Sequence, residues 1–214
     1  TTIIEDGTEA VYDLTEPLTS SFTANSIVIH NCGEQPLAGF SVCNLGAINL
    51  AKFYDAANND VDWEALKAAV GYASRFLDNV IDTTPYFFEQ NREIQKEGER
   101  RVGLGTMGIA ELMVRMGVRC GSQESLDLID NIYRFIAREA YTTSTEIAQE
   151  KGAFPQFEAE KFLESGYMQQ MDEDVRDLVR ERGSSKIDTS SSASRGNTTS
   201  RTSSDCHNMA CDGR

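Results

Sequence analysis

Residues 41–50 read Ser41-Val42-Cys43-Asn44-Leu45-Gly46-Ala47-Ile48-Asn49-Leu50, a short extended stretch whose apolar character suits a core strand. From here to about residue 183 the pattern of this 214-residue chain is strongly helical. Residues 1–31, by contrast, are rich in Thr, Ser, Val and Ile and contain five acidic residues but no Lys or Arg. The sequence therefore predicts a β-rich beginning followed by a helix-rich main part.

Apolar residues recur at helical spacing in the main part. A first helix is predicted within Val61–Ile81, and a second from Ser122, a good N-cap, to Gly152. Shorter helices fit Met107–Met116 and Glu173–Arg182. The two long stripes consist of Leu66, Val70, Ala73, Leu77 and Val80, and of Leu126, Ile129, Tyr133, Ile136, Ala140 and Ile147. We interpret these faces as core and expect them to pack against parts of a protein larger than this chain.

Composition indicates an ordinary globular protein, with 40% apolar and 25% charged residues. The net charge of −14 repels phosphate backbones and argues against DNA binding, although backbone donors can still hold a small nucleotide. Adaptation to high salt is an alternative explanation of this charge. No apolar run has the length of a membrane span and no signal peptide is visible. The five cysteines, an odd number, favour a reducing compartment, so we expect a cytoplasmic protein.

Three segments near the start occur in a characteristic order: Val11-Tyr12-Asp13-Leu14-Thr15-Glu16-Pro17, Phe22-Thr23-Ala24-Asn25 and Ile27-Val28-Ile29-His30-Asn31-Cys32. Val11–Leu14 and Ile27–His30 are predicted to be short strands. Together the segments resemble the C-terminal motifs of inteins, which implies that residues 1–31 are the end of a Hint-type intein. The N-terminal half of an intein is missing, so C-terminal cleavage, or splicing in trans with a missing partner, is the expected reaction.

The final residues of this segment suit that chemistry. The thiol of Cys32 can accept an acyl group, and the Asn31 side chain can attack its own carbonyl and cut the bond to Cys32. His30 can donate a proton to the scissile peptide, and Asp13 stands where inteins place an assisting acid. The alternative is that His30 and Asn31 simply form a turn after a strand.

Downstream of this junction, three blocks resemble ribonucleotide reductases, in particular the adenosylcobalamin-dependent class. They are Cys32-Gly33-Glu34-Gln35-Pro36-Leu37, the stretch of residues 41–50, and Arg100-Arg101-Val102-Gly103-Leu104-Gly105-Thr106-Met107-Gly108. The resemblance covers roughly residues 32–183. It implies a fragment of a ten-stranded α/β barrel, taken from a vitamin B12-dependent ribonucleoside-diphosphate reductase and inactive alone.

The resemblance also implies roles for three residues. Cys32 would carry the thiyl radical that removes the 3′-hydrogen of the ribonucleotide, and Glu34 would take the proton of the 3′-hydroxyl. Cys43 would belong to the reducing thiol pair, whose other member is missing here. The resemblance alone implies the cofactor adenosylcobalamin, nucleotide effectors and a thioredoxin-type reductant. The alternatives are buried structural thiols for Cys32 and Cys43, and a solvated carboxylate for Glu34.

The spacing Gly103-x-Gly105-x-x-Gly108 imitates a dinucleotide fingerprint. Because no clear βαβ unit surrounds it, we reject a dinucleotide site and expect the glycines to allow close helix packing.

Residues 184–214 are rich in Ser, Thr, Arg and Asn, and are predicted to be a disordered, atypical tail. Cys206, His207 and Cys211 lie in it, but three ligands without a scaffold make a weak zinc site, and we predict no metal site. The expected organisation is therefore an intein segment at 1–31, a reductase fragment at 32–183 and the tail at 184–214. The main functional hypothesis is ribonucleotide reduction, and the alternative is a protein-splicing element without reductase activity.

Overall fold

The computed structural model describes residues 21–24, 27–30, 37, 39–185 and 187–188, in two units that divide between Gly39 and Phe40. The first unit contains strand β1 (Ser21–Ala24) and strand β2 (Ile27–His30), an antiparallel pair in which Ser21 lies opposite His30. The strand predicted at Ile27–His30 is thus confirmed. The other predicted strand, Val11–Leu14, lies outside the described residues.

The second unit is organised around three parallel strands. Strand β3 (Asn44–Asn49) pairs with β6 (Val102–Met107), and β6 pairs with the short β7 (Ile187–Asp188), so the order is β3-β6-β7. Parallel neighbours require crossover connections, which helices supply here. The described part of the chain is therefore a helix-rich α/β fragment.

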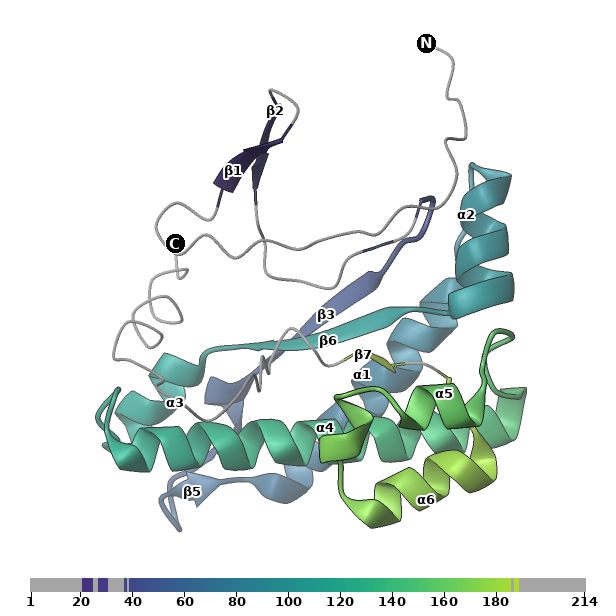
Figure 1. The fold of residues 1–214 in the computed structure, drawn as a ribbon. Coiled ribbons are helices and arrows are strands. Elements are labelled where there is room, and N and C mark those ends of the chain that lie inside the picture. The colour runs from purple at the N-terminus through teal and green to yellow at the C-terminus, as the bar shows by residue number, and fades with distance from the viewer. Residues whose placement is uncertain (1–20, 25–26, 31–36, 38, 186, 189–214) are drawn as a thin grey trace. The chain divides into compact units, whose positions relative to one another are not determined.

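Two long helices cover one side of this sheet. Helix α1 (Trp63–Thr83) contacts β3 and β6, while α4 (Gln123–Lys151) contacts α1 and β7 (Figure 1). The predicted cap Ser122 is confirmed, since its side chain accepts a hydrogen bond from the backbone N–H of Ser125. Helix α1 begins at a similar cap that was not predicted, in which the Asp62 side chain accepts from the backbone N–H of Ala65. Gly152 ends α4 as predicted.

The apolar stripes of these helices form the core of the described chain. The expectation that they need a partner outside the chain is wrong, because α1 and α4 bury most of each stripe between themselves and the sheet. Burial of this apolar area is the main stabilising contribution to the unit. The residues of this core that are at most 1% exposed are Leu50, Leu66, Val70, Ile81, Val102, Leu104, Leu112, Ile132, Ile136 and Ala140.

Smaller elements connect and extend this framework. A second cluster, around Tyr141 and Val179, joins α4 to the helices that follow it. The predicted helix at Glu173–Arg182 is confirmed as α6. The remaining elements are η1 (Leu50–Phe53), β4 (Tyr54–Asp55), β5 (Asp60–Val61), α2 (Glu89–Ile94), the π-helical turn η2 (Gln95–Glu99), α3 (Ile109–Met116), α5 (Ala159–Leu163) and η3 (Met168–Gln170).

The glycine-rich block does not lie where the sequence analysis placed it. Gly103 and Gly105 belong to strand β6 itself, and α3 begins only at Ile109 because Met107 completes the strand. A βαβ unit, β3-α1-β6, does surround the block, so that reason for rejecting a dinucleotide site was wrong. The fingerprint nevertheless needs its glycines after a strand, whereas here the first two lie within one.

The segment after Gly183 also continues the fold. Ser184 and Ser185 are buried, and both hydroxyls lie within hydrogen-bond distance of the Ser144 hydroxyl, at 2.9 and 3.2 Å. The next described residues form β7 on the edge of β6. The prediction that the atypical tail begins at residue 184, based on the few large apolar side chains that follow, is wrong for Ser184 and Ser185. Polar hydrogen bonding, which apolar periodicity does not reveal, holds Ser184 and Ser185 instead.

Candidate active site around Cys43

The predicted site residues are only partly described. Asp13, Asn31, Cys32 and Glu34 lie outside the described residues, and His30 is the last residue of β2. Cys43 is described in full, directly before β3. Its surroundings therefore carry the structural account of the site.

The Cys43 thiol lies beside the backbone of β6. A Cβ atom added to Gly103 would be 3.4 Å from Cys43 Sγ and 2.6 Å from Leu45 Cδ2. Glycine at this position therefore lets β3 side chains lie over β6, which was not the predicted role of helix packing. Cys43 is half-buried, and its Sγ lies 3.8 Å from the carbonyl oxygen of Asn44 as a weak donor.

This thiol lies on the side of the sheet that faces away from α1. Asn44 points the other way, since its Nδ2 donates to the Leu77 carbonyl of α1 at 3.4 Å. On the side that carries Cys43, Leu45 is 62% exposed and Met107, at the end of β6, is 56% exposed. Within the described residues, Cys43 is therefore at the border of an open apolar sheet face.

A polar cluster lies next to Cys43 in the register of the strands. The Ser41 hydroxyl donates to Glu99 Oε2 at 2.8 Å, and Arg101 places Nε at 3.2 Å and one terminal nitrogen at 3.1 Å from the same oxygen. The Arg101 side chain is only 8% exposed. A buried arginine needs such a counter-charge, because an isolated buried charge costs several kcal/mol (roughly, after relaxation).

The backbone that presents this cluster has an unusual shape. The π-helical turn Gln95–Glu99 leads into Arg100, whose φ of 47° lies in the left-handed region. The fully buried Gln95 side chain holds the backbone of Arg101. Its amide donates to the Arg101 carbonyl at 2.7 Å and accepts from the Arg101 N–H at 3.3 Å. Because π-turns and left-handed non-glycine residues cost free energy, they persist where other contacts fix them, frequently at functional sites.

Charged residues on two helices, α1 and α4, form a network with Arg100. Its guanidinium contacts Asp78 at 2.9 Å and Asp82 at 2.8 Å, both on α1. Lys151, at the end of α4, approaches the same two carboxylates at 2.6 and 2.9 Å. This Asp78–Asp82–Arg100–Lys151 network ties α1 and α4 to the segment that carries Glu99 and Arg101.

The network makes a testable contribution to acid stability. Hydrogen bonds from Arg100, and then from Lys151, lower the pKa of Asp82 from 3.8 to about 2. A lowered folded-state pKa stabilises the fold above the unfolded value, and this stabilisation is lost as the pH falls from about 4 to about 2. Since the side chain is 36% exposed, we expect a contribution of only about 1 kcal/mol. Urea unfolding at pH 5 and pH 2.5 should show a smaller pH effect in Asp82→Asn than in the unmodified chain, and an equal effect would contradict the assignment.

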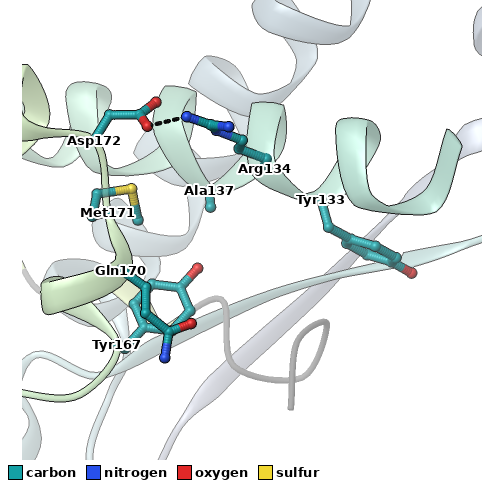
Figure 2. A pocket seen from close by; sticks show the side chains of 7 residues that line it. All are labelled: Tyr133, Arg134, Ala137, Tyr167, Gln170, Met171 and Asp172. Carbon is teal, nitrogen blue, oxygen red and sulfur yellow. Dashed lines mark hydrogen bonds and ion pairs between the residues drawn. The ribbon is translucent and has the colours of Figure 1, made fainter. Parts of the chain in front are cut away.

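A separate hollow lies between α4 and the segment before α6. Tyr133, Arg134, Ala137, Tyr167, Gln170, Met171 and Asp172 line it, and Arg134 points toward Asp172 across it (Figure 2). Its volume of about 20 Å³ suits a single water and not a nucleotide. Tyr133 also bonds to the Thr106 hydroxyl of β6, at 2.8 Å, so this hollow is part of the packing between α4 and the sheet.

Two further classes of site are missing from the described part of the chain. It contains no group of three or more His, Cys, Asp and Glu side chains arranged for a metal ion. The zinc candidates Cys206, His207 and Cys211 lie outside it. None of its helices has both the length and the apolarity to cross a membrane.

These features define an α/β protein with a thiol at the start of a parallel strand. The sequence model of the family described as "Ribonucleotide reductase, barrel domain" matches residues 19–202, so the chain belongs to that family. The match includes β1 and β2 and extends past Gly183, so it crosses both expected domain boundaries.

Curated relatives agree with this family. Over 135 residues the chain is 43% identical to the vitamin B12-dependent ribonucleoside-diphosphate reductase of Mycobacterium tuberculosis, a match to 63% of this chain and 19% of that protein. The Thermoplasma acidophilum protein of the same name is 36% identical over 135 residues, covering 63% of this chain and 17% of that protein. The alpha subunit of the Chlamydia pneumoniae ribonucleoside-diphosphate reductase is 33% identical over 141 residues, 66% of this chain and 13% of that protein. The chain thus spans less than a fifth of the length of each of these relatives.

No role is predicted from the sequence for Gln95, Glu99 or Arg101. Arg101 stood inside the quoted block Arg100–Gly108, but it served only to recognise the family. The signal that was available is the pair of arginines directly before an apolar strand, where a charge needs a buried partner.

Proposed function

We propose that this chain is a segment of an adenosylcobalamin-dependent ribonucleotide reductase and supplies part of its active site. The observation that carries the proposal is the half-buried Cys43 thiol over Gly103, at the start of a parallel strand in a chain of the reductase barrel family. The names of the relatives from Mycobacterium tuberculosis and Thermoplasma acidophilum favour the vitamin B12-dependent class. By resemblance, the same motif supplies Cys32 and Glu34.

The roles of these residues follow from the bonds that the reaction changes. A thiyl radical on Cys32 takes the hydrogen atom from the 3′ carbon, and Glu34 accepts the proton of the 3′-hydroxyl while the 2′-hydroxyl leaves as water. Cys43 and a second thiol then supply two electrons and two protons and become a disulfide. Cys32 finally returns its hydrogen atom to the 3′ carbon. One C–O bond is replaced by one C–H bond, and two thiols are oxidised.

Adenosylcobalamin supplies the initiating radical when it is bound. We assign no residue of this chain to holding the cofactor. Cys32, Glu34 and Cys43 are instead proposed to act on the ribonucleotide, by moving its protons and its 3′-hydrogen atom.

The fold supports a further part of the proposal. The order β3-β6-β7, with helices on one side and an open apolar side on the other, suits an arc of the ten-stranded α/β barrel. We assign the segment from Cys32 through β7 to this barrel, and the residues after Asp188 to a tail of atypical composition. Ribonucleotide substrate, nucleotide effectors and a thioredoxin-type reductant are the partners proposed for the whole enzyme, in the cytoplasm.

A chimeric enzyme tests this function. The matched segment of the Mycobacterium tuberculosis reductase would be replaced by the corresponding segment of this chain. We expect the chimera to convert a ribonucleoside diphosphate to the deoxy form in the presence of adenosylcobalamin and dithiothreitol, and to form none without the cofactor. A folded chimera that binds nucleotide but forms no product would contradict the proposal, provided that the parent enzyme is active in the same assay.

For residues 1–31 we propose the C-terminal segment of an intein, with Cys32 as the first residue after it. The proposal rests on the resemblance of residues 11–32 to intein motifs, and β2 ends at His30, directly before Asn31 and Cys32. Asn31 would cut the peptide bond by cyclisation, His30 would assist as proton donor, and Asp13 would assist the junction. In such an arrangement Cys32 serves first as the splicing nucleophile and later as the radical carrier.

Cleavage at this junction gives a direct prediction. During incubation of the 214-residue chain at neutral pH, intact-mass spectrometry should show the loss of residues 1–31. Asn31→Ala should abolish the loss, because alanine has no side-chain amide to close the succinimide, whereas Asn25→Ala serves as a matched control. Equal cleavage in the Asn31→Ala chain would refute cyclisation of Asn31, and a stable full-length mass in the unmodified chain would leave only splicing in trans; neither outcome affects the reductase.

A further inference from the structure

We propose that Arg101 is a positioning residue for thiol chemistry at Cys43, whose positive guanidinium beside the strand start stabilises Cys43 as a thiolate. The inference rests on the proposed function in one respect, since it takes Cys43 to be a thiol that is oxidised and reduced in turnover. Arg101 itself makes no contact with substrate in this role. It acts through the sulfur of Cys43.

The register of the strands places the two residues side by side. Asn44 pairs with Val102, and the backbone N–H of Asn44 donates to the Arg101 carbonyl at 3.4 Å, so Cys43 and Arg101 are the positions directly before the two paired strands. Two residues further upstream the correspondence continues, because Ser41 donates to Glu99. Ser41 and Glu99 thus flank the same junction from which Cys43 enters β3.

The Arg101 guanidinium has one terminal nitrogen that takes no part in its contact with Glu99. Its Nε and one terminal nitrogen share a single oxygen of Glu99, and its other terminal nitrogen is buried without a hydrogen-bond partner among the described residues. A buried N–H without an acceptor is costly, roughly 1–3 kcal/mol, so such a group is retained where it serves a purpose. An anion formed transiently nearby, such as a thiolate, is an acceptor that would satisfy it.

The other cationic side chains nearby are paired with carboxylates, so we assign this role to Arg101. On the same segment, Arg100 is engaged by Asp78 and Asp82 of α1, and Lys151 of α4 lies against the same two carboxylates. Glu99 is the acidic group that contacts Arg101, and it weakens the positive field without cancelling the free donor. The clamp by Gln95 and the left-handed Arg100 hold Arg101 in this place.

The step that benefits is the reduction of the Cys43 disulfide. A thiolate of an external dithiol attacks the sulfur bonded to Cys43, the S–S bond breaks, and Cys43 leaves with the electron pair as a thiolate. The second thiol of the reductant then resolves the mixed disulfide, so the reductant is oxidised to a disulfide and the enzyme pair is reduced. Disulfide exchange is faster when the leaving thiolate is more stable, and nearby cations stabilise thiolates.

Peptide-resolved alkylation tests the inference on the 214-residue chain. The rate of reaction of Cys43 with iodoacetamide would be followed from about pH 6 to about pH 10 in the unmodified chain, Arg101→Met, Arg101→Lys and Glu99→Gln. We expect Arg101→Met to slow alkylation at neutral pH about 3- to 10-fold and to move the midpoint of the pH profile upward. Arg101→Lys should retain most of the effect, and Glu99→Gln should move the midpoint in the opposite direction. Cys120, exposed and distant in sequence, is the internal control.

The opposite signs separate an electrostatic role from a structural one. Loss of folding would move Arg101→Met and Glu99→Gln together toward the profile of the urea-denatured chain, so a common direction would overturn the proposal, as would unchanged profiles. If Arg101→Met does not fold, Glu99→Gln still gives a signed result, with Arg101→Lys as the variant that keeps the charge. The chimera reports separately on the proposed function: an inactive chimera with shifted profiles refutes the reductase, whereas an active chimera with unshifted profiles refutes the role of Arg101.

Discussion

Cys32→Ser in the chimera should abolish both product formation and the washout of tritium from the 3′ position of the ribonucleotide. Cys43→Ser should abolish product formation but leave 3′ washout measurable. The two cysteines differ because Cys32 is proposed to remove the 3′-hydrogen atom, whereas Cys43 supplies electrons only after the 2′-hydroxyl has left. A serine O–H bond is much stronger than S–H, so a hydroxyl cannot replace the Cys32 thiol as hydrogen-atom carrier, and a hydroxyl cannot form the disulfide through which Cys43 supplies electrons.

The control for this pair is Cys120→Ser, which should leave both measurements unchanged because Cys120 lies in the turn before α4, outside the proposed site. Product formation and tritium washout would be measured on the same samples, with folding checked by circular dichroism. Washout that persists in Cys32→Ser, or a fully active Cys43→Ser enzyme, would contradict the roles assigned to these residues.

Asp78→Ala should destabilise the fold by about 3 kcal/mol, the largest effect that we expect from a single change outside the apolar core. The Asp78 side chain is 1% exposed and lies 2.9 Å from Arg100 and 2.6 Å from Lys151. Removing it leaves a largely buried guanidinium with Asp82 as its remaining carboxylate partner in the network. Because Arg100 precedes Arg101 directly, the change should also loosen the segment beside Cys43.

An exposed ion pair provides the matched comparison. Arg75 lies 2.8 Å from Glu150, but these side chains are 37% and 55% exposed. Glu150→Ala should therefore cost at most about 1 kcal/mol. Urea unfolding of both variants at pH 7 gives the two free-energy changes, and equal losses for Asp78→Ala and Glu150→Ala would show that the network does not stabilise the fold as proposed.

Helix periodicity was the part of the fold that the sequence predicted well. The segments around Leu66 and Ile136 have a stripe, a cap and a glycine or β-region stop, and each signal depends on neighbours close in sequence. The partner of each stripe was predicted wrongly. Periodicity shows that a face is buried, but which surface buries it is decided by contacts far apart in the chain, here between α1 and α4.

The sheet was harder to predict for a physical reason. Strand β6 carries Gly103 and Gly105, and glycine is unfavourable in strands, so local propensity argued against one. Glycine is accommodated in this strand at position 103 because it allows Leu45 and Cys43 to approach the backbone closely. Similarly, the hydroxyls of Ser144, Ser184 and Ser185 hold the start of the presumed tail through contacts between residues about 40 positions apart.

The residues of the candidate site were also hard to predict from local sequence signals. Cys32, Glu34 and Cys43 were proposed from a resemblance between motifs, because no rule of spacing reveals a radical site. The cluster of Gln95, Glu99 and Arg101 depends on a π-helical turn and a left-handed residue, neither of which has a signal in the sequence.

The oxidation state of Cys43 after one turnover shows whether this thiol supplies the electrons that reduce the ribonucleotide. Fully reduced chimera would be mixed with ribonucleotide and adenosylcobalamin without external reductant, quenched in acid, alkylated, and analysed peptide by peptide. We predict that Cys43 forms a disulfide and so resists alkylation, in a one-to-one ratio with the deoxyribonucleotide formed. Product that accumulates while Cys43 stays fully alkylated would contradict it.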